Sequence, residues 1–168
     1  MSSASGINVN NDWYTPEFWL KPVWDIFGKI DLDPASSIKA NETVNASNIF
    51  TIGQNGLKQD WYGKVFLNPP FSSPMLSNFL KKAVKEYESG RVEEMIILTN
   101  SGTDTKWSKI ITDKSTVAFT IGRISFVRPN GSSVGSTSRG QMYCYMGPNK
   151  QKFIDELLKT GKFWIPNI

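Results

Sequence analysis

The sequence contains no histidine and only one cysteine, Cys144. Without histidine there is no histidine-based catalytic triad, no imidazole general base and no histidine metal ligand. A single cysteine excludes an internal disulfide and a cysteine cluster for zinc. We therefore expect no metal site built from histidine or from a cysteine cluster, and a chemistry that comes from other side chains.

Long apolar runs are also missing. No stretch approaches the ~20 apolar residues of a membrane-spanning helix. The polar start MSSASGINVNND lacks the apolar core of a signal peptide. We expect a cytoplasmic protein with no membrane partner. The length of 168 residues predicts one domain, 1–168, with a flexible tail at 1–11. The net charge of +4 permits a nucleic-acid partner. Its oligomeric state is not indicated.

Strands and helices alternate through the middle of the chain, and strands dominate its last third. Thr15 is expected as the N-cap of the first helix, followed by Pro16 in its first turn. Polar residues 41–63 are expected to be irregular apart from a short strand. This order predicts an α/β fold with a mostly parallel central sheet and an antiparallel C-terminal edge, flanked by helices. The predicted helices span residues 15–28, 73–90, 106–114 and 150–161; the predicted strands span 30–32, 49–52, 64–68, 94–100, 115–121, 123–127 and 141–147.

The segment KVFLNPPFSSP, residues 64–74, ends a predicted strand with two consecutive prolines. These residues could simply terminate the strand. They also form a rigid corner in which the Asn68 side chain and the Pro69 carbonyl are two hydrogen-bond acceptors, which suits an exocyclic amine. Phe71 could stack on the ring that carries this amine, a contact worth about 1–3 kcal/mol for a nucleobase. Asp33-Pro34 follows another predicted strand, and ligands bind at the carboxyl ends of such strands.

The tetrapeptide Asn68-Pro69-Pro70-Phe71 resembles the (Asp/Asn/Ser)-Pro-Pro-(Tyr/Phe) motif of amino-directed methyltransferases that use S-adenosylmethionine. Five blocks occur in order: DWYTPEFW, IDLDPASS, NGLKQDWYGKVFLNPPFS, LTNSGTDTKW and GRISF. They make residues 12–147 similar to the phage-type, Dam-like DNA N6-adenine methyltransferases. The resemblance implies a Rossmann-like methyltransferase fold, S-adenosylmethionine as cofactor and a flipped adenine in double-stranded DNA as substrate. It also suggests a role in protecting phage DNA from restriction.

The resemblance assigns roles to matching positions. Asn68, Pro69, Pro70 and Phe71 would hold and stack the target adenine, and Asp60 would accept from the adenine amine of the cofactor. The methionine part of the cofactor would contact two segments, the first of them at a helix N-terminus that favours a carboxylate. The glycine-rich turn of most methyltransferases is absent from the second, where Ala35, Ser36 and Ser37 stand instead. The cofactor residues in these segments are Tyr14, Thr15, Pro16, Asp31, Asp33, Pro34, Ala35 and Ser36.

DNA contacts are expected from basic residues near polar loops, namely Lys106, Arg123, Arg128 and Arg139. Each of these could equally be a solvated surface charge. Nothing in the sequence looks like a separate recognition domain, so a short or relaxed target sequence is expected. Two other functions stay open: methylation of another amine, in an RNA base or a protein glutamine, and a catalytically silent DNA-binding domain. The missing glycine turn favours the silent domain.

Overall fold

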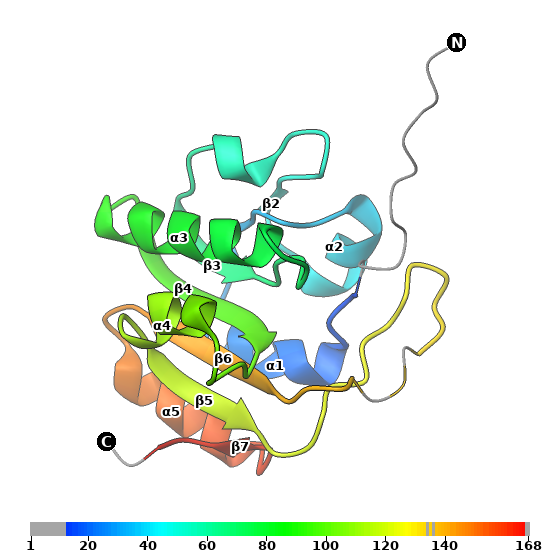
Figure 1. The fold of residues 1–168 in the computed structure, drawn as a ribbon, viewed down its shortest axis with the longest axis vertical. Coiled ribbons are helices and arrows are strands. Elements are labelled where there is room, and N and C mark those ends of the chain that lie inside the picture. Colours follow the sequence, from blue (N-terminus) through cyan, green and yellow to red (C-terminus); the bar gives the residue numbers. More distant parts are fainter. Residues whose placement is uncertain (1–12, 134, 136, 167–168) are drawn as a thin grey trace.

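The computed structural model describes residues 13–133, 135 and 137–166, so the tail expected at 1–11 lies outside the described residues. The described chain forms a seven-stranded sheet with the order β2-β1-β3-β4-β6-β5-β7 (Figure 1). The strands are β1 (Leu32–Asp33), β2 (Asn48–Ile49), β3 (Gly63–Leu67), β4 (Val92–Asn100), β5 (Thr116–Thr120), β6 (Gln141–Met146) and β7 (Phe163–Trp164).

The sheet changes character at β4. The strands β2, β1, β3 and β4 are mutually parallel. β6 runs antiparallel to both β4 and β5, and β5 runs antiparallel to β7. The expected α/β class, with a mostly parallel sheet and an antiparallel C-terminal edge, is confirmed.

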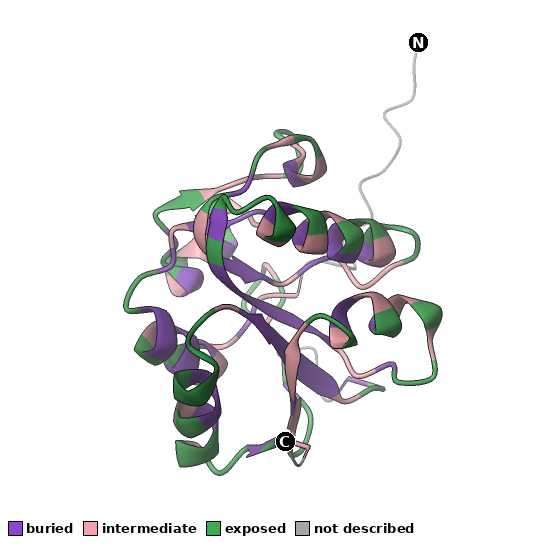
Figure 2. Ribbon diagram, turned by 90° about the vertical axis from the view of Figure 1, so that its left-hand side faces the viewer, coloured by how far each residue is buried: buried purple, intermediate pink, exposed green. Residues whose placement is uncertain are grey.

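Helices cover both faces of the sheet. α1, α2 and α5 contribute to one buried apolar cluster, whereas α3 and α4 contribute to the other. Figure 2 shows the buried sheet between exposed outer helix faces. No described helix is long and apolar enough to cross a membrane. The helices are α1 (Glu17–Phe27), α2 (Ile38–Val44), α3 (Met75–Glu88), α4 (Lys106–Thr112) and α5 (Lys150–Lys159), with a short 3₁₀ helix, η2, at Gly56–Lys58.

The central strand β4 explains the continuous apolar run of residues 95–98 within the sequence EMIILTN. Met95 and Ile97 belong to the cluster under α3 and α4, whereas Ile96 and Leu98 belong to the cluster under α1 and α5. Successive side chains of a strand point to opposite faces, so a strand covered on both sides needs apolar residues at every position. Each such side chain contributes about 1.5–3 kcal/mol when fully buried.

The strand predicted at residues 123–127 is not formed. Only Val127 pairs there, through isolated bridges to Tyr14 and Ser133. The N–H of Ile124 donates instead to the side-chain oxygen of Gln141 at 3.0 Å. At Ile124, a side chain therefore takes the place of a neighbouring strand as hydrogen-bond partner. The strand beside β5 at the edge of the sheet is β7.

Helix α2 was not predicted: it starts at Ile38, where no element was expected, and ends within the segment 41–63 that was expected to be irregular. Ser37 caps its N-terminus by accepting from the N–H of Ala40 at 3.0 Å, and Asn45 ends it in a left-handed conformation. The helix has seven residues, of which only Ala40 and Val44 are buried. This is too short a pattern to show helical periodicity, although Ser37 and Asn45 are typical cap residues.

The start of α1 also differs from the prediction. The N-cap is Pro16 rather than Thr15, and no side chain caps this end. Thr15 lies one residue earlier with its side chain buried. Its hydroxyl accepts a hydrogen bond from Asn68, so it binds the corner after β3 and not the helix.

Candidate active site

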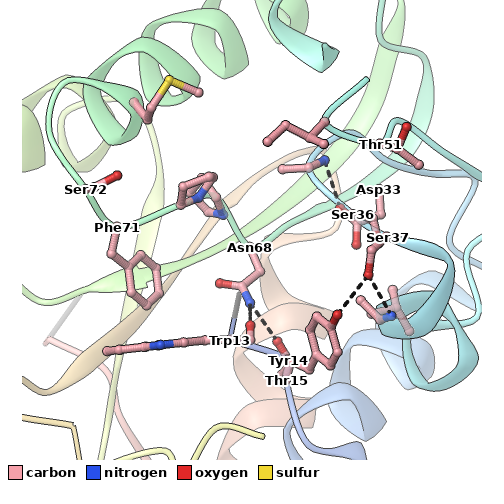
Figure 3. Close-up of a pocket in the computed structure, with 17 residues that line it drawn as sticks. Trp13, Tyr14, Thr15, Asp33, Ser36, Ser37, Thr51, Asn68, Phe71 and Ser72 are labelled. Carbon is pink, nitrogen blue, oxygen red and sulfur yellow. Dashed lines mark hydrogen bonds between the residues drawn. The ribbon is translucent and has the colours of Figure 1, made fainter. Parts of the chain in front are cut away.

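A cleft of about 390 Å³ opens at the carboxyl ends of β1 and β3. The segment before α1 forms another of its walls (Figure 3). Strands β1 and β3 are parallel neighbours, so the segments that follow them leave the sheet side by side. Nine residues expected from the sequence line this cleft: Tyr14, Thr15, Asp33, Ala35, Ser36, Asn68, Pro69, Pro70 and Phe71.

Four expected cofactor residues are not among the lining residues: Pro16, Asp31, Pro34 and Asp60. The Asp60 side chain is 81% exposed, and its carboxylate lies 3.5 Å from the guanidinium of Arg91. Asp60 and Arg91 precede β3 and β4, so they lie at the amino ends of these strands, opposite the cleft. The structure thus places Asp60 outside this cleft, and its assignment to the adenine of the cofactor stays a prediction.

Asp31 and Pro34 have structural contacts behind the cleft. The Asp31 carboxylate accepts from the N–H of Lys64 at 3.0 Å and pairs with the Lys29 ammonium at 2.8 Å, tying β1 to β3. The Pro34 carbonyl packs against Gly56 so closely that a Cβ at that position would collide with it. Asp31 thus fixes the start of β1 and Pro34 fixes the turn after it, and neither lines the cavity.

The Asn68 carboxamide is fixed by the segment before α1. Its Nδ2 donates to the Trp13 carbonyl oxygen at 2.9 Å and lies 3.2 Å from the Thr15 hydroxyl oxygen. Both amide donors are directed to this side, so the Oδ1 acceptor points the other way, toward the side of Phe71 in Figure 3. The corner thus presents an oriented acceptor at the cleft.

Aromatic rings surround this acceptor. The Phe71 ring lies 5.7 Å from Trp13 and 5.9 Å from Phe126, centroid to centroid, with interplanar angles of 86° and 72°. Such edge-to-face contacts are favourable and hold a ring in place. Phe126 is fully buried, whereas Trp13 and Phe71 line the cleft. We call Trp13, Asn68 and Phe71 the aromatic end of the cleft.

The opposite end of the cleft, formed by Asp33, Ala35 and Ser36, is called the acidic end. Asp33 is 3% exposed, and burial raises the pKa of its carboxyl group to about 7. The N–H of Ala35 donates to its Oδ1 at 3.2 Å, which favours the ionised form and offsets part of this rise in pKa. The Ser36 hydroxyl favours the ionised form as well. Within the described chain its buried Oγ has no partner in hydrogen-bonding geometry.

A hydroxyl pair links the two ends. Ser37 donates to the Tyr14 hydroxyl oxygen at 3.2 Å while its Oγ accepts from the N–H of Ala40. The N-terminus of α2 is thereby joined to the segment that orients Asn68. Both hydroxyl groups line the cleft between the acidic and aromatic ends (Figure 3).

The expected DNA-contact residues lie at the same edge of the sheet as the cleft. Lys106 begins α4 shortly after the carboxyl end of β4, and the loop between β5 and β6 carries Arg123, Arg128 and Arg139. β5 ends and β6 begins at this edge, because Phe119 pairs with Met142 and Asn100 with Gln141. All four basic residues are exposed. Arg123 also donates to the Thr137 carbonyl at 2.8 Å, which joins two parts of the loop.

Several lining residues were not identified from the sequence. Trp13 stands in the first of the five blocks, and Ser72 directly follows the Pro-Pro-Phe corner, so adjacency was an available signal for both. Ser37 ends the second block, IDLDPASS, and was likewise marked by its place. No local signal marks the remaining five, which the fold alone brings to the cleft. The lining residues missed are Trp13, Ser37, Ala40, Val44, Thr51, Ile52, Ser72 and Met75.

The arrangement suits a flat ring that carries an amine at the aromatic end and a polar, charged group at the acidic end. The oriented Oδ1 of Asn68 can accept a hydrogen bond from an N–H group, and the aromatic walls favour a planar ligand. In the described part of the chain, no three residues among histidine, cysteine, aspartate and glutamate gather as they would around a metal ion. The oriented acceptor and the aromatic walls can together recognise and orient an amine.

Comparison with protein families gives an independent result. Residues 3–159 match the model of the family described as DNA N-6-adenine-methyltransferase (Dam). No curated protein matches the chain. The matched range contains every residue of the cleft, and the match confirms the resemblance seen in the five sequence blocks.

Proposed function

The chain belongs to the Dam family of DNA N-6-adenine-methyltransferases, and on this premise we propose that its cleft binds S-adenosylmethionine and a flipped adenine side by side. The aromatic end would take the adenine and the acidic end the methionine part of the cofactor. S-adenosylmethionine supplies a methyl group that is already activated on a sulfonium. The chain's own residues then have to orient the two reactants and exclude water.

The observation that carries this proposal is the oriented carboxamide of Asn68. Its two donors face Trp13 and Thr15, so Oδ1 is available to accept from the N6 amine of adenine. The Pro69 carbonyl is the second acceptor we assign to this amine. An amine whose two N–H bonds are held by acceptors keeps its lone pair directed at the methyl group. Pro70 stiffens the corner, and Phe71 stacks on the base.

The acidic end fits the cofactor chemically. A buried carboxyl group with few partners and a buried hydroxyl with none are both expected to gain partners when a ligand binds. We assign the Asp33 carboxylate to the cofactor's ammonium, and the Ser36 and Tyr14 hydroxyls to its carboxylate. Ala35 contributes the N–H that holds Asp33 and a small side chain that leaves space.

DNA would approach the edge of the sheet that carries the cleft. A base inside a duplex has to be flipped before it can enter such a cleft. We assign phosphate contacts to Lys106, Arg123, Arg128 and Arg139. Replacing Arg128 or Arg139 by alanine is expected to weaken DNA binding at every sequence and to lower the slope of log affinity against log salt by about 1 each. Anisotropy titrations at several salt concentrations measure this slope, and an unchanged slope removes that residue from the interface.

The decisive experiment is transfer of labelled methyl from S-adenosylmethionine to unmethylated duplex DNA, followed by nucleoside analysis. We expect N6-methyladenine with the wild-type protein and a loss of about 10²–10³-fold in rate for Asn68→Ala, similar to loss of one oriented group in other active sites. Asn78→Ala, an exposed asparagine in α3, is the matched control. Label on RNA or on protein glutamine, with none on DNA, would redirect the proposal to another amine. No label on any substrate would favour a silent DNA-binding domain.

A further inference from the structure

The Asn68 amide group can adopt only one of its two orientations in this structure. The Trp13 carbonyl oxygen, 2.9 Å from Nδ2, accepts hydrogen bonds and cannot donate. Turning the amide over would bring two oxygens together at that distance. The Thr15 hydroxyl oxygen, 3.2 Å from the same Nδ2, provides a second acceptor. The side on which Oδ1 lies is therefore set by a segment 55 residues earlier in the chain.

This segment is itself held in place. The N–H of Tyr14 donates to the Val127 carbonyl at 2.8 Å, and the N–H of Val127 donates back at 3.0 Å. Thr15 is 3% exposed, so its hydroxyl is fixed by packing. The hydroxyl does not cap α1, because the N-cap is Pro16 and has no side-chain bond. The contact with Asn68 thus accounts for a buried threonine at this position.

We propose that Thr15, together with the Trp13 carbonyl, is a positioning residue that turns the Asn68 acceptor toward the target amine. This rests on the proposed function of the cleft. It also makes position 68 selective for a carboxamide: aspartate could accept from the amine, but it would place a second oxygen against the Trp13 carbonyl. The related tetrapeptide allows aspartate at its first position, yet the surroundings of Asn68 in this chain favour asparagine.

The first test is Thr15→Val, which keeps the shape of the side chain and removes the hydroxyl. We expect the single-turnover methylation rate at saturating S-adenosylmethionine to fall about 10-fold, with the Kd for the cofactor within twofold of wild type. Thr15→Ser should restore most of the rate. Thr99→Val is the matched control, because Thr99 is also a buried threonine, and its hydroxyl has no partner in the described chain; it should leave the rate unchanged. A weaker cofactor Kd with an unchanged rate would assign Thr15 to the cofactor and overturn the proposal.

The second test is Asn68→Asp, which should lower the rate more than Thr15→Val does. A rate close to wild type would overturn the proposal, because aspartate cannot donate to the Trp13 carbonyl. Melting temperatures of all variants show whether a lost rate reflects unfolding. If Thr15→Val fails to fold, Asn68→Asp and Thr15→Ser still decide the outcome.

A third readout does not depend on activity. The side-chain amide resonances of Asn68 in a ¹⁵N-labelled sample are identified by their absence in Asn68→Ala. We expect them to shift in Thr15→Val and to return toward wild type in Thr15→Ser. Unchanged resonances in Thr15→Val would overturn the positioning role. If the wild-type protein methylates nothing, the proposed function fails, whereas the resonances still decide whether Thr15 orients Asn68.

Discussion

The two ends of the cleft differ in how completely their hydrogen bonds are formed before a ligand binds. At the aromatic end, both donors of the Asn68 amide have partners, and Phe71 is held between Trp13 and Phe126. At the acidic end, the buried Asp33 carboxylate accepts from the N–H of Ala35, whereas the Ser36 Oγ has no partner within the described chain. The aromatic end is organised in advance for orientation, which is what a reaction of an amine requires. Burial of polar groups at the acidic end lowers the stability of the ligand-free protein, and a bound ligand can restore it.

Among the effects on cofactor binding, the largest is expected when the charge of the acidic end is removed. Asp33→Asn should weaken the Kd for S-adenosylmethionine about 10–100-fold, because a hydrogen bond between charged groups contributes about 1.5–3 kcal/mol. Since the pKa of Asp33 is about 7, wild-type affinity should fall up to about 10-fold per pH unit below pH 7. Calorimetric titrations from pH 5.5 to 7.5 measure both effects. An affinity of Asp33→Asn within twofold of wild type would exclude Asp33 as a cofactor ligand.

The same substitution should stabilise the ligand-free protein. The pKa of Asp33 is higher in the folded protein than the ~3.9 of an unfolded chain. The contribution of the Asp33 carboxyl group to folding stability is therefore complete below pH 4 and is lost as the pH rises to 7. Asp33→Asn should therefore exceed wild type in stability by on the order of 2 kcal/mol at pH 8, and by less at pH 5. Thermal unfolding at both pH values measures this.

Asp31 provides a contrast of opposite sign for this measurement. Burial raises its pKa, but the Lys29 ammonium and the Lys64 N–H outweigh burial and hold the pKa below its usual value. The Asp31 carboxylate therefore stabilises the folded protein at pH values above its pKa in the unfolded chain, and this stabilisation is lost on acidification. Asp31→Asn should therefore destabilise the protein at pH 8. Equal effects of the two substitutions would contradict the difference between these carboxyl groups.

At the aromatic end, Phe71→Leu should lower kcat/KM for DNA about 10-fold, within the range of about 1–3 kcal/mol for stacking on a base. The cofactor Kd should not change, since this end is assigned to the adenine. Phe71→Tyr keeps the ring and should retain most of the activity. Steady-state kinetics with varied DNA, beside cofactor titrations, separate the two ends. A Phe71→Leu enzyme that loses cofactor affinity instead would place the cofactor at the aromatic end.

The smallest effect is expected at Ser36. A buried hydroxyl without a partner costs folding free energy, so Ser36→Ala should stabilise the ligand-free protein by about 1 kcal/mol, or about 2–4 °C in Tm. Cofactor affinity should fall about 5-fold. Thr99→Val removes another buried hydroxyl without a partner, outside the cleft, and should stabilise the protein without changing affinity. Unchanged Tm and affinity in Ser36→Ala would mean that this hydroxyl is not reserved for a ligand.

Much of the fold follows from local patterns. The predicted helix at 73–90 is observed at Met75–Glu88, and the apolar run EMIILTN forms part of β4. The predicted strand at 123–127 is absent: Val127 forms isolated bridges, and the N–H of Ile124 donates to the Gln141 side chain. Helix α2 was missed because a seven-residue helix with two buried positions has almost no periodic signal. Local patterns were reliable where an element was long and clearly amphipathic or fully buried.

The candidate site shows the same division. The blocks around Tyr14, Asp33 and Asn68 were recognised in the sequence, and the structure brings all three to one cleft. Asp60 was assigned to the cofactor from the resemblance, but β3 lies between Asp60 and Asn68 and carries them to opposite edges of the sheet. Trp13 was not identified from the sequence, and the structure reveals it as a wall of the cleft in contact with Phe71.

The sequence by itself determined the α/β class, the two-sided burial of β4 and the chemical character of the Asn68–Phe71 corner. These follow from neighbouring residues, whose spacing and backbone restrictions act locally. Tertiary structure decided which way the Asn68 amide faces, how far burial raises the pKa of Asp33 and which carboxyl groups reach the cleft. Each of these depends on groups far apart in the chain, because hydrogen-bond partners and burial exist only once the strands have paired.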